Sequence, residues 1–289
     1  MTKEELLSIL KENKIYLEKS LGQNFLVSDL ALRQIIEASA LQPGERVLEV
    51  GPGIGILTEA LLAEGVDLTA VELSENLVHY LVSRYGRRED FRVIKADILK
   101  TDLQNLYSSL GKKEVEHDQG RSIAAYKVVA NIPYYLTGKL IPYFLESDLK
   151  PQVMYLMMQK EVGERIIGKK GKESLLSLAT KFYARAEICF EVPKESFYPS
   201  PKVDSVFIKI TPQEEVPKIS HPDGQKMYFR VIKAAFSGKR KQLHNSLASS
   251  FHLSKDETLA WIDRADLQPT VRPERLSVND FTRLSDTLE

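Results

Sequence analysis

An apolar run of the chain ends in Asn131-Ile132-Pro133-Tyr134, which brings an amide, a rigid turn and an aromatic ring to one place. The amide oxygen can accept hydrogen bonds from an exocyclic amine, and the ring can stack on a flat base. The segment therefore predicts a site that holds adenine by its amino group. The tetrapeptide alone leaves an alternative open, the ordinary end of a buried strand followed by a proline turn.

A glycine-rich loop, Glu49-Val50-Gly51-Pro52-Gly53-Ile54-Gly55, follows a strand-like run and precedes a helical pattern. Glycines at this place let the backbone approach a ligand closely. In the dinucleotide fingerprint the third glycine lies five positions after the first, whereas here it lies four positions after it. The spacing disfavours an NAD-dependent oxidoreductase, and a purely structural turn remains the other interpretation.

Acidic and amide side chains follow the next strand-like runs. Glu72 comes 21 residues after Gly51, where a carboxylate can accept the hydroxyls of a ribose. Asp97 follows the third run, where it could contact an adenine amino group, and Asn131 follows the fourth. Open parallel sheets bind ligands at the carboxyl ends of their strands. The series therefore predicts one nucleotide-type cofactor site along this edge.

The elements that must position these residues are short apolar strands alternating with amphipathic helices. The strand-like runs are 46–50, 68–71, 91–95, 127–130 and 153–158. This alternation predicts an α/β fold with a mostly parallel sheet covered on both faces. Two later runs, 186–192 and 203–210, have no helix between them and predict an antiparallel hairpin at the end of the sheet. We expect the single cysteine, Cys189 in the first of these runs, to be packed in the core.

A polar, proline-bearing linker at 211–217 precedes helical patterns only. We therefore predict a sheet domain over residues 1–212 and a small all-helical domain over 213–289. The polar segment Gly111–Arg121 has no periodicity and is interpreted as a surface loop.

Charge is balanced overall, with 40 basic and 40 acidic residues. Nucleic-acid binding needs positive surface, so local distribution matters more than the sum. Between Lys226 and Asn245 there are six basic and no acidic residues, among them Lys239, Arg240 and Lys241. We predict that this stretch binds RNA backbone, with a solvated helix face as the alternative.

One cysteine and scattered histidines predict no metal site. The chain also has no apolar run of the roughly 18 residues that a bilayer span needs.

Four ordered motifs resemble the ribosomal RNA adenine dimethyltransferase family, most closely its bacterial small-subunit members. They are Leu21–Leu26, Glu49–Gly55, Asn131–Tyr134 and Phe197–Ser205, and the likeness runs from Leu21 to Ile210. The resemblance implies a Rossmann-like S-adenosylmethionine methyltransferase sheet and a C-terminal RNA-binding domain. It also implies dimethylation of N6 in two adjacent adenosines near the 3′ end of small-subunit rRNA during ribosome biogenesis. We accordingly expect a cytoplasmic monomer that acts on a pre-ribosomal particle and uses neither metal nor membrane.

The resemblance also assigns roles residue by residue. It implies that Asn24, Leu26 and Gly51 contact the methionine part of the cofactor, Glu72 its ribose and Asp97 its adenine, with Asn131 shared between cofactor and target. Tyr134 is expected to stack on one face of the target base, and Phe197 or Tyr198 on the other.

Tyr135 stands where many relatives have Asn, and no role is assigned to it. Two alternatives within or near the family stay open. One is methylation of a large-subunit adenine, as in the resistance-type relatives, and the other is a ribosome-assembly factor without catalysis.

Overall fold

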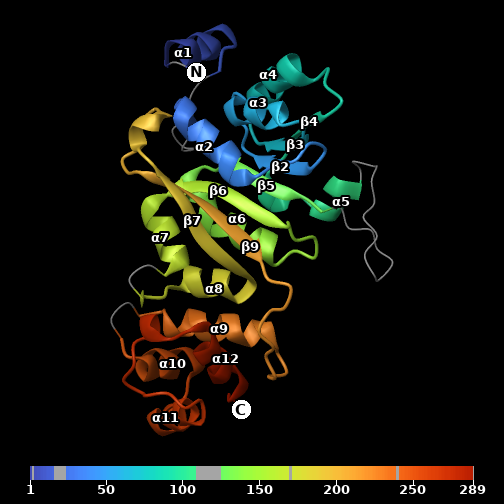
Figure 1. The fold of residues 1–289 in the computed structure, drawn as a ribbon. Coiled ribbons are helices and arrows are strands. Elements are labelled where there is room, and N and C mark those ends of the chain that lie inside the picture. The colour runs from blue at the N-terminus through green and yellow to red at the C-terminus, as the bar shows by residue number, and fades with distance from the viewer. Residues whose placement is uncertain (2, 16–23, 109–124, 169–170, 239–240, 289) are drawn as a thin grey trace. The chain divides into compact units, whose positions relative to one another are not determined.

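The computed structural model describes residues 1, 3–15, 24–108, 125–168, 171–238 and 241–288 (Figure 1). They form two compact units. The sheet unit comprises Met1–Gly163 and Glu187–Pro212, and the helical unit comprises Glu164–Ala186 and Gln213–Glu289. The division predicted from the sequence places 164–186 in the first domain, whereas the compact units of the structure place this segment with the C-terminal helices.

The described strands form a seven-stranded sheet in the order β4-β3-β2-β5-β6-β9-β7 (Figure 1). The strands are β2 (Arg46–Val50), β3 (Asp67–Glu72), β4 (Phe91–Lys95), β5 (Lys127–Asn131), β6 (Val153–Gln159), β7 (Ala184–Val192) and β9 (Ser205–Pro212). The first five in the sheet order pair in parallel, and β9 pairs antiparallel with β6. The predicted α/β class, with its mostly parallel sheet and terminal antiparallel hairpin, is confirmed.

A second, two-stranded pairing joins β1 (Phe25–Leu26) to β8 (Phe197–Tyr198). The two strands are antiparallel, with Phe25 opposite Tyr198 and Leu26 opposite Phe197. Residues that lie far apart in the sequence are thereby brought next to the glycine loop.

Helices of the sheet unit follow the strands in alternation, as the sequence pattern predicts. They are α1 (Lys3–Glu12), α2 (Asp29–Ser39), α3 (Ile56–Ala63), α4 (Glu75–Tyr85), α5 (Leu103–Ser108) and α6 (Thr137–Leu145), and α7 (Lys160–Ile167) crosses into the helical unit. Ser28 caps α2, since its Oγ accepts a bond from the Ala31 N–H at 3.2 Å. Ser74 stands at the N-cap of α4 but makes no side-chain bond there. The strand residues Leu48, Leu68, Val129 and Met157 are fully buried, so the sheet is the centre of the core.

Cys189 is exposed, and the expectation of a buried thiol is wrong. It lies on β7, an edge strand whose positions alternate between exposed and partly buried. Glu187 and Glu191 share the exposed face with it. This period-two pattern of charged neighbours was the signal in the sequence that would have placed Cys189 outside.

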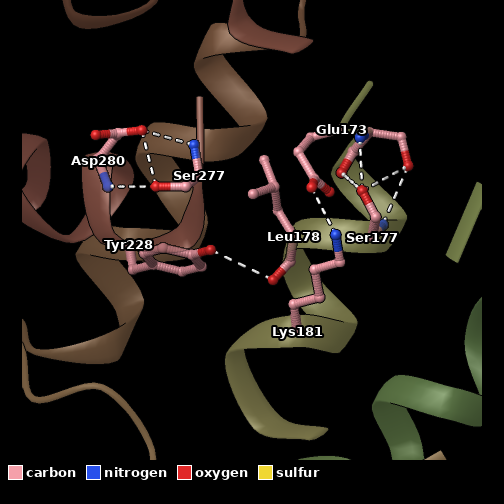
Figure 2. A network of polar contacts seen from close by, with 8 residues as sticks. Glu173, Ser177, Leu178, Lys181, Tyr228, Ser277 and Asp280 are labelled. Carbon is pink, nitrogen blue, oxygen red and sulfur yellow. Dashed lines mark hydrogen bonds and ion pairs between the residues drawn. The ribbon is translucent and has the colours of Figure 1, made fainter. Parts of the chain in front are cut away.

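The helical unit contains α8 (Leu175–Tyr183), α9 (Gln225–Ala235), α10 (Leu243–Phe251), α11 (Lys255–Arg264) and α12 (Val278–Asp286). The sequence patterns predicted α9, α11 and α12 but not α10. A polar contact links α8 to α9, since the Tyr228 hydroxyl donates to the Leu178 carbonyl at 3.3 Å (Figure 2). Just before α8, the Glu173 N–H donates to the Glu274 carbonyl at 2.8 Å. The same network holds the Glu173–Lys181 ion pair. These bonds explain why 164–186 belongs to this unit.

Candidate active site

A cavity of about 310 Å³ lies in the sheet unit where the parallel strands end. Residues from five separate segments of the chain line it. Those that the sequence singled out are Asn24, Gly51, Glu72, Asp97, Asn131, Ile132, Pro133 and Tyr134. The parallel pairing of β4, β3, β2 and β5 brings their carboxyl ends together, as the predicted edge site requires.

The glycine loop between β2 and α3 lines the cavity, and two of its glycines have left-handed backbone conformations. Gly51 has φ +69° and Gly53 has φ +61°, a region that side chains other than glycine rarely occupy. A Cβ on Gly53 would lie 2.9 Å from Cε1 of Phe25, which also lines the cavity. The missing side chain at Gly53 therefore lets the β1 segment pack directly on the loop.

Glu72 is held rigidly at the end of β3. Its Oε1 accepts the Ser74 N–H at 2.9 Å and its Oε2 accepts the Gly53 N–H at 3.2 Å. Burial raises the pKa of this carboxyl, and the backbone donors of Ser74, Gly53 and Leu73 oppose that rise. Each oxygen retains a further acceptor position for a ligand hydroxyl, so the geometry suits a ribose diol.

Glu49 is a buried acid beneath the loop that the sequence interpretation did not single out. Its side chain is 1% exposed, and Oε2 accepts the Thr58 hydroxyl at 2.6 Å. Burial raises its pKa from 4.5 to about 8, the Thr58 bond opposes the rise, and the charge of Glu72 adds to it. At neutral pH Glu49 is therefore mostly a neutral acid. An acidic residue within an apolar strand was the signal available in the sequence.

Asp97 lies just after β4 and lines the cavity. Its Oδ1 accepts the Leu99 N–H at 3.1 Å, and Lys100 Nζ lies 3.7 Å from Oδ2. Tyr135 lines the cavity as well and is 55% exposed. The pKa of Tyr135 is raised by burial first and then by the charges of Asp97 and Glu72, which places the ring near both carboxylates.

Asn131 ends β5 with its amide oriented by a backbone contact. Its Nδ2 donates to the Asn24 carbonyl at 3.2 Å, a bond between residues 107 positions apart. Because the amino end of the amide is used in this way, Oδ1 is the end available as an acceptor. Pro133 follows with φ −56° and ψ 134°, and its carbonyl accepts the Leu136 N–H at 2.9 Å. The turn after Asn131 is thus held by the proline ring of Pro133 and by the hydrogen bond to its carbonyl.

Tyr134 enters the cavity with its hydroxyl already bonded. The hydroxyl lies 2.9 Å from Oγ of Ser205 at the start of β9. The side chain is partly buried, and burial raises its pKa while the Ser205 bond opposes the rise. The ring edge that carries the hydroxyl is therefore tied to the sheet.

Three predicted site residues of the sheet unit do not line this cavity. Leu26 and Phe197 are each 3% exposed and belong to the hydrophobic core. Tyr198 packs against a second core cluster, and Lys3 Nζ lies over its ring at 4.9 Å from the centroid. Base stacking by Phe197 or Tyr198 stays a prediction.

The basic stretch that is predicted to bind RNA backbone is only partly described. Lys241 is exposed and lies between α9 and α10 rather than within a helix. Lys239 and Arg240 are outside the described residues, as are Leu21–Gln23 of the first motif and the segment Gly111–Arg121.

Within the part of the chain that the structure describes, no group of three potential ligand residues could hold a metal ion. In the same residues no helix has the length and apolar character of a bilayer span.

Known proteins resemble this chain in sequence. The model of the ribosomal RNA adenine dimethylase family matches residues 15–289. A ribosomal RNA small subunit methyltransferase A from Dehalococcoides mccartyi is 38% identical over 268 residues, which are 92% of this chain and 86% of that protein.

Solved structures share the fold. A dimethyladenosine transferase from Plasmodium falciparum has a TM-score of 0.69 at 24% identity, covering 90% of this chain and 95% of its own. The 23S rRNA methyltransferase ErmE has a TM-score of 0.65 at 23% identity, covering 92% and 99%. The fold is therefore shared by a dimethyladenosine transferase and by a 23S rRNA methyltransferase.

Proposed function

The chain belongs to the ribosomal RNA adenine dimethylase family, and we propose that it dimethylates N6 of two adjacent adenosines near the 3′ end of small-subunit rRNA. It is an S-adenosylmethionine-dependent rRNA adenine dimethyltransferase. The small-subunit assignment is supported by relatives at 35–38% identity that are named ribosomal RNA small subunit methyltransferase A. Fold similarity does not decide it, because the 23S enzyme shares the fold. The cofactor supplies a methyl group activated by its sulfonium.

The residues of the cavity suit that cofactor. Glu72 has acceptor positions left for the ribose hydroxyls after its two backbone bonds, and Asp97 lies at the same edge for the adenine amine. The loop at Gly51 and Gly53 offers backbone without side chains. A sulfonium methyl needs alignment rather than a strong base, so none of the cavity residues is assigned that role.

The observation that carries the proposal is the orientation of Asn131. With Nδ2 bonded to the Asn24 carbonyl, Oδ1 is available to accept one N6 hydrogen, and the Ile132 carbonyl is available for the other. Two acceptors draw the amine toward tetrahedral geometry and free the nitrogen lone pair, which is otherwise delocalised into the ring. Pro133 fixes the backbone that carries the Ile132 carbonyl, and the Tyr134 ring stacks on the base, which must leave its helix or loop to enter.

Dimethylation follows from the same two acceptors. Each transfer releases one N6 proton to solvent, so after the first transfer N6 keeps one hydrogen, which one acceptor still holds. After two transfers no hydrogen remains, and the product loses that hold. The geometry therefore allows a second methylation and disfavours retention of the product.

The test is methyl transfer from labelled cofactor to small and large ribosomal subunits, followed by mapping of the modified base. Asn131→Ala should lower turnover on small subunits by about a hundredfold, as removal of a transition-state hydrogen-bond partner does. Tyr134→Ala should lower it by at least about tenfold, because stacking of an aromatic ring on a base contributes about 1–3 kcal/mol. Calorimetric affinity for S-adenosylmethionine shows whether the cofactor still binds. Near-normal turnover in both variants would contradict the mechanism, and labelling of large subunits alone would replace the substrate.

We further propose that the stretch with Lys239, Arg240 and Lys241 contacts RNA backbone of a pre-ribosomal particle, and that the protein acts as a cytoplasmic monomer. Charge reversal at these three positions should weaken RNA binding and leave cofactor affinity unchanged, because phosphate contacts supply affinity without sequence readout. Unchanged RNA affinity would make the stretch a solvated surface only. Light scattering of the purified protein tests the monomer.

A further inference from the structure

We propose that Ser205 is a positioning residue for methyl transfer, acting by holding the Tyr134 ring at the angle at which it stacks on the target base. This inference rests on the proposed function, because it presupposes that Tyr134 contacts the base. The observation behind it is the 2.9 Å contact between the Tyr134 hydroxyl and Ser205 Oγ.

The sheet brings the two residues to one edge although they are 71 positions apart. Tyr134 follows β5, which pairs in parallel with β6, and β6 pairs antiparallel with β9. In that register Gln159, the last residue of β6, lies opposite Ser205, the first residue of β9. The start of β9 therefore lies beside the carboxyl ends of β5 and β6, where the cavity is.

Ser205 is itself immobilised. The residue is 0% exposed, and Oγ contacts only Tyr134 among the described residues. The preceding Asp204 accepts the Lys160 N–H at 2.9 Å through its carbonyl and the Lys194 N–H at 3.0 Å through Oδ1. The residue that precedes Ser205 is thus held by two hydrogen bonds, one to its backbone and one to its side chain.

A tyrosine ring at a cavity rim turns about two side-chain torsions, and one bond at its far end restricts both. Because the bond already orders the ring, less side-chain conformational entropy is lost when the base binds. One neutral hydrogen bond of this kind corresponds to a change of roughly two- to tenfold in rate. The effect should appear in turnover of RNA rather than in cofactor binding, since Ser205 does not line the cavity.

The test is a double-mutant cycle with Ser205→Ala and Tyr134→Phe, measured as methyl transfer to small ribosomal subunits. Each single variant should lose two- to tenfold in kcat, with the KM for S-adenosylmethionine changed less than twofold. The double variant should be no slower than either single one, because both remove the same bond. Ser39→Ala is the matched control, since Ser39 is a buried serine whose Oγ donates to the Ile35 carbonyl of its own helix, and it should leave kcat unchanged.

Multiplying losses in the double variant would show that Ser205 acts without Tyr134 and would overturn the inference. A fall in melting temperature for Ser205→Ala with unchanged kcat would do the same. Both results leave an active wild type and the proposed function in place. A wild type that methylates no small-subunit adenosine would instead overturn both proposals together.

Discussion

Glu49→Gln should make the folded sheet unit more stable at neutral and mildly alkaline pH, and leave its stability unchanged near pH 4. The folded pKa of Glu49 is raised from 4.5 to about 8, so the folded protein binds a proton that the unfolded chain releases. Stability from this group is therefore lost as pH rises from 4.5 to about 8, and is constant outside that window. At pH 7 the interval from 4.5 spans about 2.5 pH units, which at about 1.4 kcal/mol per unit corresponds to roughly 3 kcal/mol.

Gln removes the ionisation and keeps an oxygen that can accept the Thr58 hydroxyl. For a unit of this size, 3 kcal/mol corresponds to roughly 6–12 °C in melting temperature. The assay is thermal unfolding of both proteins at a series of pH values from 4 to 9. Glu37→Gln, at an exposed position, is the control and should follow the wild type.

Two results would refute the reasoning. Parallel pH profiles for wild type and Glu49→Gln would mean that Glu49 does not stay protonated in the fold. A lower melting temperature for Glu49→Gln at every pH would mean that the carboxyl has a partner that an amide cannot replace.

Three further outcomes are expected. Gly53→Ala should weaken S-adenosylmethionine binding at least about tenfold in calorimetry, because its Cβ would meet the Phe25 ring at 2.9 Å and its φ is +61°; unchanged affinity would contradict the described loop. Cys189 should react fully with a thiol reagent under native conditions because it is exposed, and reaction only after denaturation would contradict its placement. Trp261→Phe should destabilise the helical unit by about 1–3 kcal/mol in denaturant unfolding, since it leaves the buried Leu284 carbonyl without the 2.8 Å bond from Nε1; an unchanged midpoint would argue against that bond.

The edge site could be predicted from the sequence because parallel strands align their carboxyl ends. Gly51, Glu72, Asp97 and Asn131 each follow a strand-like run, and the strand pairing brings them to one cavity. The role of this edge depends only on strand order and direction, which alternation of strands and helices largely determines.

Contacts between distant segments could not be predicted in the same way. Nothing in the local pattern of 164–186 shows that Leu178 bonds to Tyr228 or that Glu173 bonds to Glu274. The burial of Phe197 follows from its pairing with Leu26 in a two-residue strand, which is too short to leave a periodic signal. These features arise from tertiary packing, so a single sequence carries no local trace of them.

The motif Asn131-Ile132-Pro133-Tyr134 does not by itself determine how its side chains are oriented. An amide side chain presents an oxygen or an amino group with nearly the same shape, and only the oxygen can accept an N6 hydrogen. The Asn24 carbonyl selects the orientation by taking Nδ2, while Ser205 holds the far end of the Tyr134 ring. One partner comes from the segment before β1 and the other from the start of β9, so the four residues are aligned only once the whole sheet unit has formed.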